Sequence, residues 1–246
     1  MKLFSNIGKY TMFMILVLKR PQKWRVSARQ LVQELNDIGV NSIGIVSLMS
    51  VFMGAVITLQ TAANIDSPLI PAYTIGFTTR ESILLEFSPT IIALILAGKV
   101  GSSVASQLGT MRITEQIDAL AMMGVRSASF LVMPKIVAAV FFFPFLITIS
   151  MALAIFGGWM FGTLAGVVAT ADYIEGLRVD FDSFSYTYAM IKTVVFAFLI
   201  VSISAYNGFY AKGSALEVSK SSTRAVVSSS IAILISNYLI TQTLLL

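Results

Sequence analysis

The chain has 246 residues, of which 57% are apolar and 12% charged, against roughly 45–50% and ~25% in an average soluble domain. A soluble domain of this size cannot bury so much apolar surface, so the composition predicts a membrane protein. The chain has no His and no Cys, which excludes thiol nucleophiles, disulfides, Cys/His zinc sites and Ser-His-Asp triads. The net charge of +5 fits cytoplasmic loops of a membrane chain better than nucleic-acid binding, and no nucleic-acid partner is expected.

The first 40 residues are predicted to lie on the membrane surface rather than to cross it. The apolar run Thr11 to Leu18 is too short for ~30 Å of hydrocarbon, and Lys19-Arg20-Pro21 follows it instead of a signal-peptide cleavage site. The stretch 21–37 mixes apolar residues with charged ones. We therefore expect residues 4–36 to form one or two amphipathic helices on the cytoplasmic surface, with an ordinary cytoplasmic tail as the alternative.

Five strongly apolar segments predict an all-α integral membrane protein with about five transmembrane helices. Their approximate ranges are 41–60, 83–108, 130–170, 186–206 and 225–245. The third has 41 residues, more than one ordinary span of ~20, and barely accommodates two with a turn. No linker, low-complexity tract or repeat divides the chain, so a single domain is predicted over 1–246, with an interfacial segment 1–40 and a transmembrane region 41–246.

Basic residues alternate between rich and poor segments, which orients the chain. Seven Lys or Arg precede residue 41, and the segments 61–82, 99–135, 171–185 and 207–224 hold one, four, one and three. This pattern predicts a cytoplasmic N-terminus and a periplasmic C-terminus, provided that the third apolar segment crosses once. A six-span chain is the alternative, and it would place the acidic 171–185 loop inside.

Two ionisable residues within the predicted spans, Glu86 and Lys192, are candidates for a substrate cavity. Both lie roughly 5–10 Å from the predicted outer ends of their helices, at ~1.5 Å per residue. Opposite charges at matching depth favour pairing, because each alone is costly in the membrane. Pro89, one turn from Glu86, is expected to loosen the backbone and shape the opening. The alternative is that both side chains only snorkel to the interface, as is expected for Lys99 near the cytoplasmic end.

Glycines suggest where helices pack closely. Gly158, Gly162 and Gly166 are spaced by four residues and are predicted to share one helix face. Gly98 and Gly101 flank Lys99, where small residues would let a second helix approach.

A polar stretch between the second and third spans predicts a docking helix over residues 109–124. Ile113, Ile117 and Leu120 would share one face, and Glu115, Asp118 and Met122 would share another. An exposed face with acids and methionine suits a groove of a soluble protein. A helix lying on the headgroups is the alternative, although acids fit poorly beside anionic lipid.

Several motifs resemble the signature block of the MlaE/YrbE-type permeases, membrane subunits of ABC transporters that work with MCE-domain proteins on lipids. They are Glu86-Phe-Ser-Pro89, Ala97-Gly-Lys-Val-Gly-Ser102, Leu108-Gly-Thr-Met-Arg-Ile-Thr-Glu-Gln-Ile-Asp-Ala-Leu120 and Met122-Met-Gly-Val125, with Leu131-Val-Met-Pro134, Lys192-Thr-Val-Val-Phe196, Asn207-Gly208 and Ser222-Thr-Arg-Ala-Val-Val227 further on. The resemblance covers roughly residues 40–245. The chain departs from the family pattern at Leu85 and Lys99, where Arg is usual, and at Gln107 and Asn237, where acids are common.

The resemblance implies a homodimer of the permease in the bacterial inner membrane. It also implies a cytoplasmic ABC ATPase subunit bound through the coupling helix 109–124, and a periplasmic MCE-domain protein on the outer face. Phospholipid would move between the permease cavity and the MCE assembly, for outer-membrane lipid homeostasis. The residues implied for ATPase contact are Met111, Arg112, Glu115, Gln116, Asp118 and Met122.

The chain has no Gly-x-x-x-x-Gly-Lys-Ser/Thr loop, so ATP hydrolysis is expected in a partner subunit rather than here. No catalytic residue, cofactor or metal is expected. The alternative function is an ion-coupled carrier or intramembrane enzyme that uses Glu86 as its titrating group. A carrier would be expected to show a repeat and more intramembrane acids.

Overall fold

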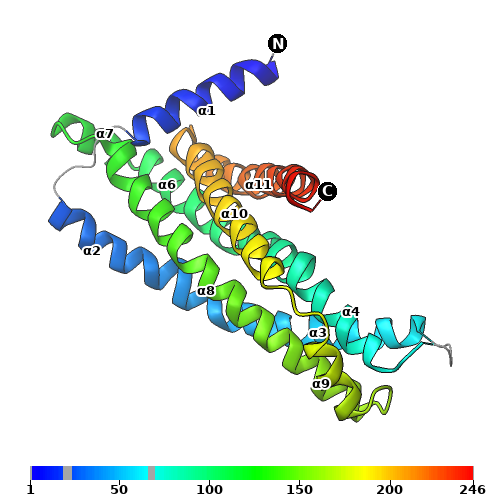
Figure 1. Ribbon diagram of the computed structural model, residues 1–246. Helices are drawn as coiled ribbons and strands as arrows, with labels where there is room; N and C mark the ends of the chain where they lie inside the picture. The colour runs from blue at the N-terminus through cyan, green and yellow to red at the C-terminus, as the bar shows by residue number, and fades with distance from the viewer. Residues whose placement is uncertain (1, 19–23, 66–69, 246) are drawn as a thin grey trace.

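The computed structural model describes residues 2–18, 24–65 and 70–245, and every regular element in these ranges is helical (Figure 1). Within them, five helical segments are long and apolar enough to cross a membrane: Arg29–Asn64, Tyr73–Ile113, Ser127–Leu164, Ser183–Phe209 and Ala215–Leu244. The predicted all-α membrane class and the number of spans are therefore confirmed.

The helices follow the chain in this order. The chain begins with α1 (Lys2–Leu18). The region of the first span follows, with α2 (Trp24–Glu34), the π-helical η1 (Leu35–Gly39), the 3-10 helical η2 (Val40–Ser42) and α3 (Ile43–Asn64). The second contains α4 (Tyr73–Ser82), η3 (Ile83–Ile91), α5 (Ile92–Leu96), η4 (Ala97–Gly101) and α6 (Ser102–Ile113), where η3 and η4 are π-helical. Then come α7 (Gln116–Met122), α8 (Ser127–Leu164), α9 (Thr170–Arg178), α10 (Ser183–Phe209) and α11 (Ala215–Leu244).

The N-terminal region differs from the predicted surface helices. Two helices do form, but α2 runs on through η1 and η2 into α3 without leaving helical backbone, although Gly39 is distorted at φ −91° and ψ −77°. By contrast, α1 packs against α10: the Phe13 ring lies 5.3 Å from that of Phe209, and the Tyr10 hydroxyl lies 2.7 Å from that of Ser202. The predicted break at Lys19-Arg20-Pro21 lies outside the described residues.

The third apolar segment forms one unbroken helix, α8, of 38 residues, even though Pro134 and Pro144 lie inside it. At ~1.5 Å per residue it is about 57 Å long, well beyond the ~30 Å of a bilayer core. One helix that crosses the membrane once therefore accounts for this apolar segment. The helix ends at Leu164, so the segment is shorter than the predicted 130–170.

Close packing of α3 against α8 forms the core at one side of the bundle. A Cβ atom on Gly54 would lie 1.8 Å from the Ala154 carbonyl oxygen, and one on Gly158 would lie 2.4 Å from Thr58 Oγ1. Gly162 faces Thr58 as well, at 2.9 Å from its Cγ2. Only glycine allows the backbones to come this close, as the spacing of Gly158 and Gly162 suggests.

Gly166 does not belong to this face, which corrects the sequence prediction. It lies beyond the end of α8 with φ +70°, and a Cβ atom added to it would meet no atom within 4 Å. Glycine is favoured there because it adopts a left-handed turn conformation without a steric penalty.

A buried arginine closes the end of the bundle formed by α4 and α9, opposite the end that carries α7 and α1 (Figure 1). The Arg80 guanidinium is 2% exposed and donates to the carbonyls of Leu177, Val179 and Asp180 at 2.9, 2.8 and 3.1 Å. It also pairs with Glu81 at 2.8 Å. Leu177 lies in the last turn of α9, where a helix leaves its carbonyls without partners, and Val179 and Asp180 follow directly, so Arg80 ties the end of α9 to α4.

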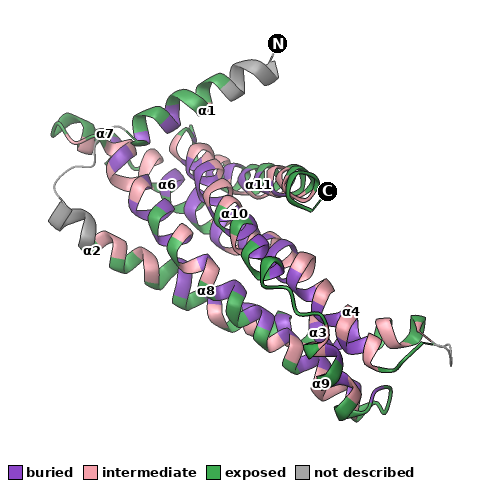
Figure 2. Ribbon diagram, in the orientation of Figure 1, coloured by how far each residue is buried: buried purple, intermediate pink, exposed green. Residues whose placement is uncertain are grey.

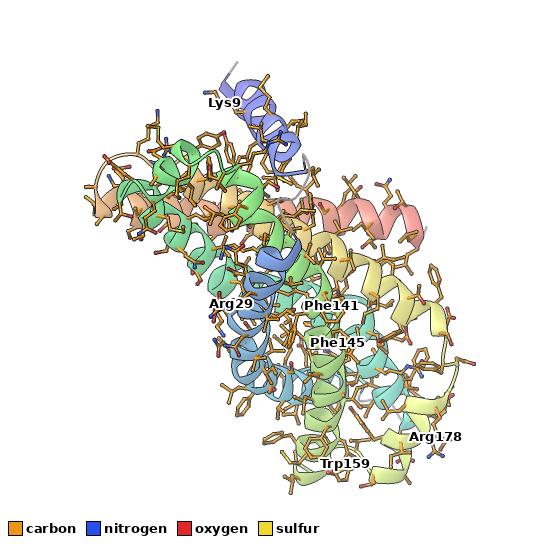
Figure 3. The ribbon with its side chains drawn as sticks, turned by 90° about the vertical axis from the view of Figure 1, so that its left-hand side faces the viewer. Lys9, Arg29, Phe141, Phe145, Trp159 and Arg178 are labelled. Atoms are coloured by element: carbon orange, nitrogen blue, oxygen red, sulfur yellow. The ribbon has the colours of Figure 1, made fainter. Side chains whose placement is uncertain are left out.

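Burial is concentrated along α10 and the inner faces of α6 and α8, whereas α1, α7 and α11 show many exposed residues (Figure 2). The side chains of Phe141 and Phe145 are exposed on the middle of α8, and Trp159 lies farther along the same helix (Figure 3). Exposed aromatic and aliphatic side chains on a spanning helix are expected where lipid surrounds it.

Candidate functional site

The structure brings Glu86 and Lys192 together. Lys192 Nζ donates to Glu86 Oε1 at 2.6 Å, joining η3 to α10. The Lys192 side chain is 0% exposed, whereas that of Glu86 is 43% exposed. The pair is therefore anchored on its cationic side and open on its anionic side.

Pro89 contributes to this geometry through the backbone. Proline has no N–H, so it cannot complete the α-helical hydrogen bond to the carbonyl of Leu85, four residues earlier. Lys192 Nζ donates to that carbonyl at 3.1 Å. The same stretch is π-helical, a distortion that often accompanies functional sites.

Three further polar side chains complete what we call the outer cluster (Glu86, Thr90, Lys192, Asn237 and Thr241). Asn237 Nδ2 and Thr90 Oγ1 donate to Glu86 Oε2 at 3.0 and 3.1 Å. Thr241 Oγ1 lies 3.5 Å from Glu86 Oε1. The carboxylate thus accepts hydrogen bonds from three helices, η3, α10 and α11.

An aromatic ring supports the buried ammonium. Lys192 Nζ lies 4.4 Å from the centroid of the Tyr188 ring, a cation–π distance, and the Tyr188 hydroxyl lies 2.7 Å from Thr241 Oγ1. Sequence reasoning missed Thr90, Tyr188 and Thr241 as site residues. A signal was available, because Glu86 and Thr90, and likewise Tyr188 and Lys192, are four residues apart and share a helix face.

The cluster lies deeper in its helices than predicted. The helix carrying Glu86 begins at Tyr73 rather than near residue 83, so Glu86 is about 20 Å along it at ~1.5 Å per residue. Similarly, Lys192 follows the start of α10 at Ser183 by nine residues. This end of both helices extends farther than the apolar pattern alone indicates.

A second polar group, which we call the inner cluster (Glu34, Gln107 and Lys135), connects α2, α6 and α8. Lys135 is 3% exposed, and its Nζ donates to Glu34 Oε1 at 2.6 Å and to Gln107 Oε1 at 2.5 Å. Nearby, Lys99 Nζ donates to the Asn41 carbonyl instead of simply extending to the interface.

The predicted docking helix over 109–124 is two helices with a break between them. α6 ends at Ile113, Glu115 takes a left-handed conformation with φ +60°, and α7 begins at Gln116. The prediction of a single helix with two faces is therefore corrected, because the break rotates the residues after it out of register with those before it.

The tip formed by this break is nevertheless exposed. Glu115, Gln116, Asp118 and Met122 are exposed, Met122 at 90%, while Ile117 is buried. Arg112 Nη1 donates to Asp118 Oδ1 at 2.6 Å across the break. Met111, by contrast, packs partly against the core and does not lie at the exposed tip.

The two glycines beside Lys99 have different surroundings. A Cβ on Gly101 would lie 2.9 Å from Ser204 Oγ of α10, so this glycine does permit a close approach. Gly98 has no atom within 4 Å of the corresponding position, so the predicted helix contact at Gly98 does not occur within the described part of one chain.

Comparison with known proteins matches most of the chain. A family model described as Permease MlaE matches residues 31–243. A probable ABC transporter permease protein of Rickettsia bellii is 33% identical, over 98% of this chain and 93% of that protein. A probable ABC transporter permease protein of Synechocystis is 30% identical, over 87% and 81% of the two chains. The Arabidopsis thaliana protein TRIGALACTOSYLDIACYLGLYCEROL 1, chloroplastic, is 31% identical, over 92% of this chain and 64% of that protein.

Proposed function

This chain belongs to the Permease MlaE family of ABC transporter permeases, and from this premise we propose that it moves phospholipids. Its partners would be an ATPase on the cytoplasmic side and an MCE-domain protein on the periplasmic side of the bacterial inner membrane. The observation that carries the proposal is the outer cluster, a charged pair held at membrane depth with its carboxylate side open. One relative supports a lipid substrate, because it bears the name of a galactolipid.

The cluster suits a lipid headgroup better than a free ion. The open Glu86 carboxylate, with Asn237 beside it, would bind an ammonium or hydroxyl group of the headgroup, and the buried Lys192 would hold that carboxylate in place. Acyl chains would lie on the apolar surface beside the site.

A homodimer would cover the outer cluster. The 43% exposure of Glu86 would place a carboxylate against hydrocarbon in a single chain, at a cost of several kcal/mol by the ~2.5–3.5 kcal/mol insertion scale. α11, which contributes Asn237, also exposes Ile231, Ile235 and Tyr238. We place the second copy against this face of α11, so that the substrate cavity lies between two outer clusters.

The exposed tip between α6 and α7 is the proposed contact with the ATPase. Glu115 and Asp118 would meet a basic or amide-bearing groove, with Gln116 and Met122 beside them, while Arg112 orients Asp118. At the other end, α4 and α9 present the surface proposed for the MCE partner.

Reconstitution tests the proposal. The permease is co-expressed with a candidate ATPase subunit and a candidate MCE-domain protein, purified as an assembly, and placed in vesicles with fluorescent phospholipid. ATP-dependent lipid transfer is expected, and Lys192→Ala should reduce it strongly. The matched control Lys212→Ala, on a cytoplasmic loop, should not.

The alternative carrier makes a different prediction in the same vesicles. A proton flux through the permease alone, without ATP and without lipid transfer, would favour the ion-coupled carrier with Glu86 as its titrating group. That result, or failure of any ATPase to co-purify, would overturn the proposed function.

A further inference from the structure

A cavity of about 390 Å³ lies beside the inner cluster, between the end of α2 with η1 and η2 on one wall and η4 with α6 on the other. Its polar lining comes from Glu34, Asp37, Asn41, Lys99, Ser103, Gln107 and Lys135. Lys99 follows Glu86 by 13 residues, about 20 Å at ~1.5 Å per residue, so this cavity and the outer cluster are separated by much of a ~30 Å bilayer core.

The charged side chains of this cavity divide into two that form an ion pair and two that do not. Lys135 is buried and already bound by Glu34 and Gln107, so its charge is compensated. Lys99 and Asp37, from opposite walls, have no ion-pair partner among residues 2–18, 24–65 and 70–245. One Lys99 donor is directed to the Asn41 carbonyl, which leaves two of its three donors for a ligand.

The backbone is distorted in the same way at both residues without an ion-pair partner, Asp37 and Lys99. Asp37 lies in the π-helical η1 and Lys99 in the π-helical η4. Single π-helical turns are rare and occur frequently at functional sites, and another of them, η3, carries Glu86. Two such turns facing one cavity form a second, independent indication that it binds something.

The charge balance specifies the ligand. Two lysines and two carboxylates line the cavity, so it has no excess positive charge to select an anion. It offers a free cation and a free anion on opposite walls, with Ile38, Val100 and Val104 adding apolar surface. A ligand of headgroup size that carries both charges, next to an apolar tail, satisfies all of these features.

We propose that this cavity binds the zwitterionic headgroup of a phosphatidylethanolamine-type lipid from the cytoplasmic leaflet, with Lys99 on the phosphate and Asp37 on the ammonium. The inference rests on the proposed phospholipid function and deepens it by adding a loading site about 20 Å from the outer cluster. Lipid would occupy the inner cavity before or after its passage past Glu86.

A cysteine-protection experiment tests this site locally. The chain has no native Cys, and Ser103 is exposed on the cavity wall. The full-length Ser103→Cys permease in detergent is alkylated while dioleoylphosphatidylethanolamine is titrated in, and the half-protecting lipid concentration is measured. Ser106→Cys is the matched control, because Ser106 is exposed on the same helix but does not line this cavity.

Three lipids and two variants separate recognition of the phosphate from recognition of the ammonium. Phosphatidylethanolamine should protect the Ser103→Cys thiol at lower concentration than phosphatidylglycerol or N-acylated phosphatidylethanolamine, both of which lack the ammonium. Lys99→Gln should raise the half-protecting concentration of all three by about tenfold, the loss of one charged hydrogen bond. Asp37→Asn should raise only that of phosphatidylethanolamine, while Lys9→Gln and Glu217→Gln, which do not line this cavity, should change none.

The inference is overturned if phosphatidylethanolamine protects the Ser103→Cys and Ser106→Cys thiols equally, if phosphatidylglycerol protects better, or if both cavity variants behave as wild type. Because the assay needs no ATP, its outcome is independent of transport. ATP-driven lipid transfer without protection of the Ser103→Cys thiol would refute only the inner site. Protection without any transfer in the complete assembly would refute the proposed function instead.

Discussion

The outer and inner clusters each hold a buried lysine against a carboxylate, but they leave different groups open. In the outer cluster the Glu86 side chain is 43% exposed, whereas Glu34 in the inner cluster is 15% exposed. The inner ion pair is therefore closed, and separate charges on Lys99 and Asp37 line the adjacent cavity. The comparison teaches that an ion pair in a membrane bundle can itself form a binding site. It can also be a structural contact that positions other charged side chains around a binding site.

The orientation of the chain in the membrane is the first test of this comparison, because it decides which cluster faces the cytoplasm. A reporter fused after Leu246 should read as periplasmic, and one inserted at 212–220 should read as cytoplasmic. These readings place the inner cluster on the cytoplasmic side. A cytoplasmic C-terminal reporter would exchange the two clusters between leaflets and refute both proposed lipid sites as assigned.

Removing the outer carboxylate should be the most destabilising single change. Glu86→Ala leaves the fully buried Lys192 without its counter-ion, which typically costs about 3–5 kcal/mol. The free energy of unfolding of the purified permease, measured by denaturant or thermal titration in detergent, should fall by that amount. The double variant Glu86→Ala with Lys192→Met, which removes both charges, should recover much of the loss.

Two glycines between the clusters give a matched pair with a smaller effect. Gly101→Leu must displace Ser204 on α10 and should cost about 1–3 kcal/mol of stability. Gly98→Leu meets no atom within 4 Å and should stay within about 0.5 kcal/mol for the isolated chain. Equal unfolding midpoints for the two variants would contradict the described packing.

The inner carboxylate should matter less than the outer one. Glu34→Ala leaves Lys135 bonded to Gln107 beside a polar cavity, so a loss of about 1–3 kcal/mol is expected. The same unfolding assay compares it directly with Glu86→Ala. A larger loss for Glu34→Ala would show that the inner pair, rather than the outer one, is the more costly to break.

Reversal of the exposed acids should affect stability least and coupling most. Glu115→Lys with Asp118→Lys exchanges the Arg112 ion pair for a repulsion at an exposed site, with an expected stability change of about 0.5 kcal/mol. In the assembly, repulsion at the ATPase contact should separate ATP hydrolysis from lipid transfer. Normal transfer by the double variant would exclude this tip as the coupling contact.

The five spans and the ion pair of the outer cluster could be predicted from the sequence. Glu86 and Lys192 stand out because they are charges inside apolar runs, and such charges need partners. Lys135 lies near the start of the predicted span 130–170 and counts among the basic residues that orient the chain, and the pattern around Glu34 is that of a surface helix, so neither residue indicates the other as its partner. Their contact depends on α2 continuing into α3, and no local pattern distinguishes a surface helix from the first turns of a longer one.

The misplaced helix ends have a similar origin. Hydropathy locates where a span is apolar and is silent about polar turns such as Tyr73–Ser82 that extend the same helix. The break after Ile113 is also hidden, because Glu115 in a left-handed conformation is uncommon for a residue other than glycine. Equal spacing by four residues places glycines on one face only within a helix, and α8 ends at Leu164, before Gly166.

The buried Arg80 has a consequence for association at the far end of the bundle. Its guanidinium fixes the last turn of α9 and the chain after it against α4, so this surface is ordered before any partner arrives. A protein that docks there does not have to offset the entropy that is lost when a loop becomes ordered, so its contacts translate more fully into affinity. Arg80 would thus order in advance the surface that we propose for the outer subunit, although that subunit would not touch the buried guanidinium itself.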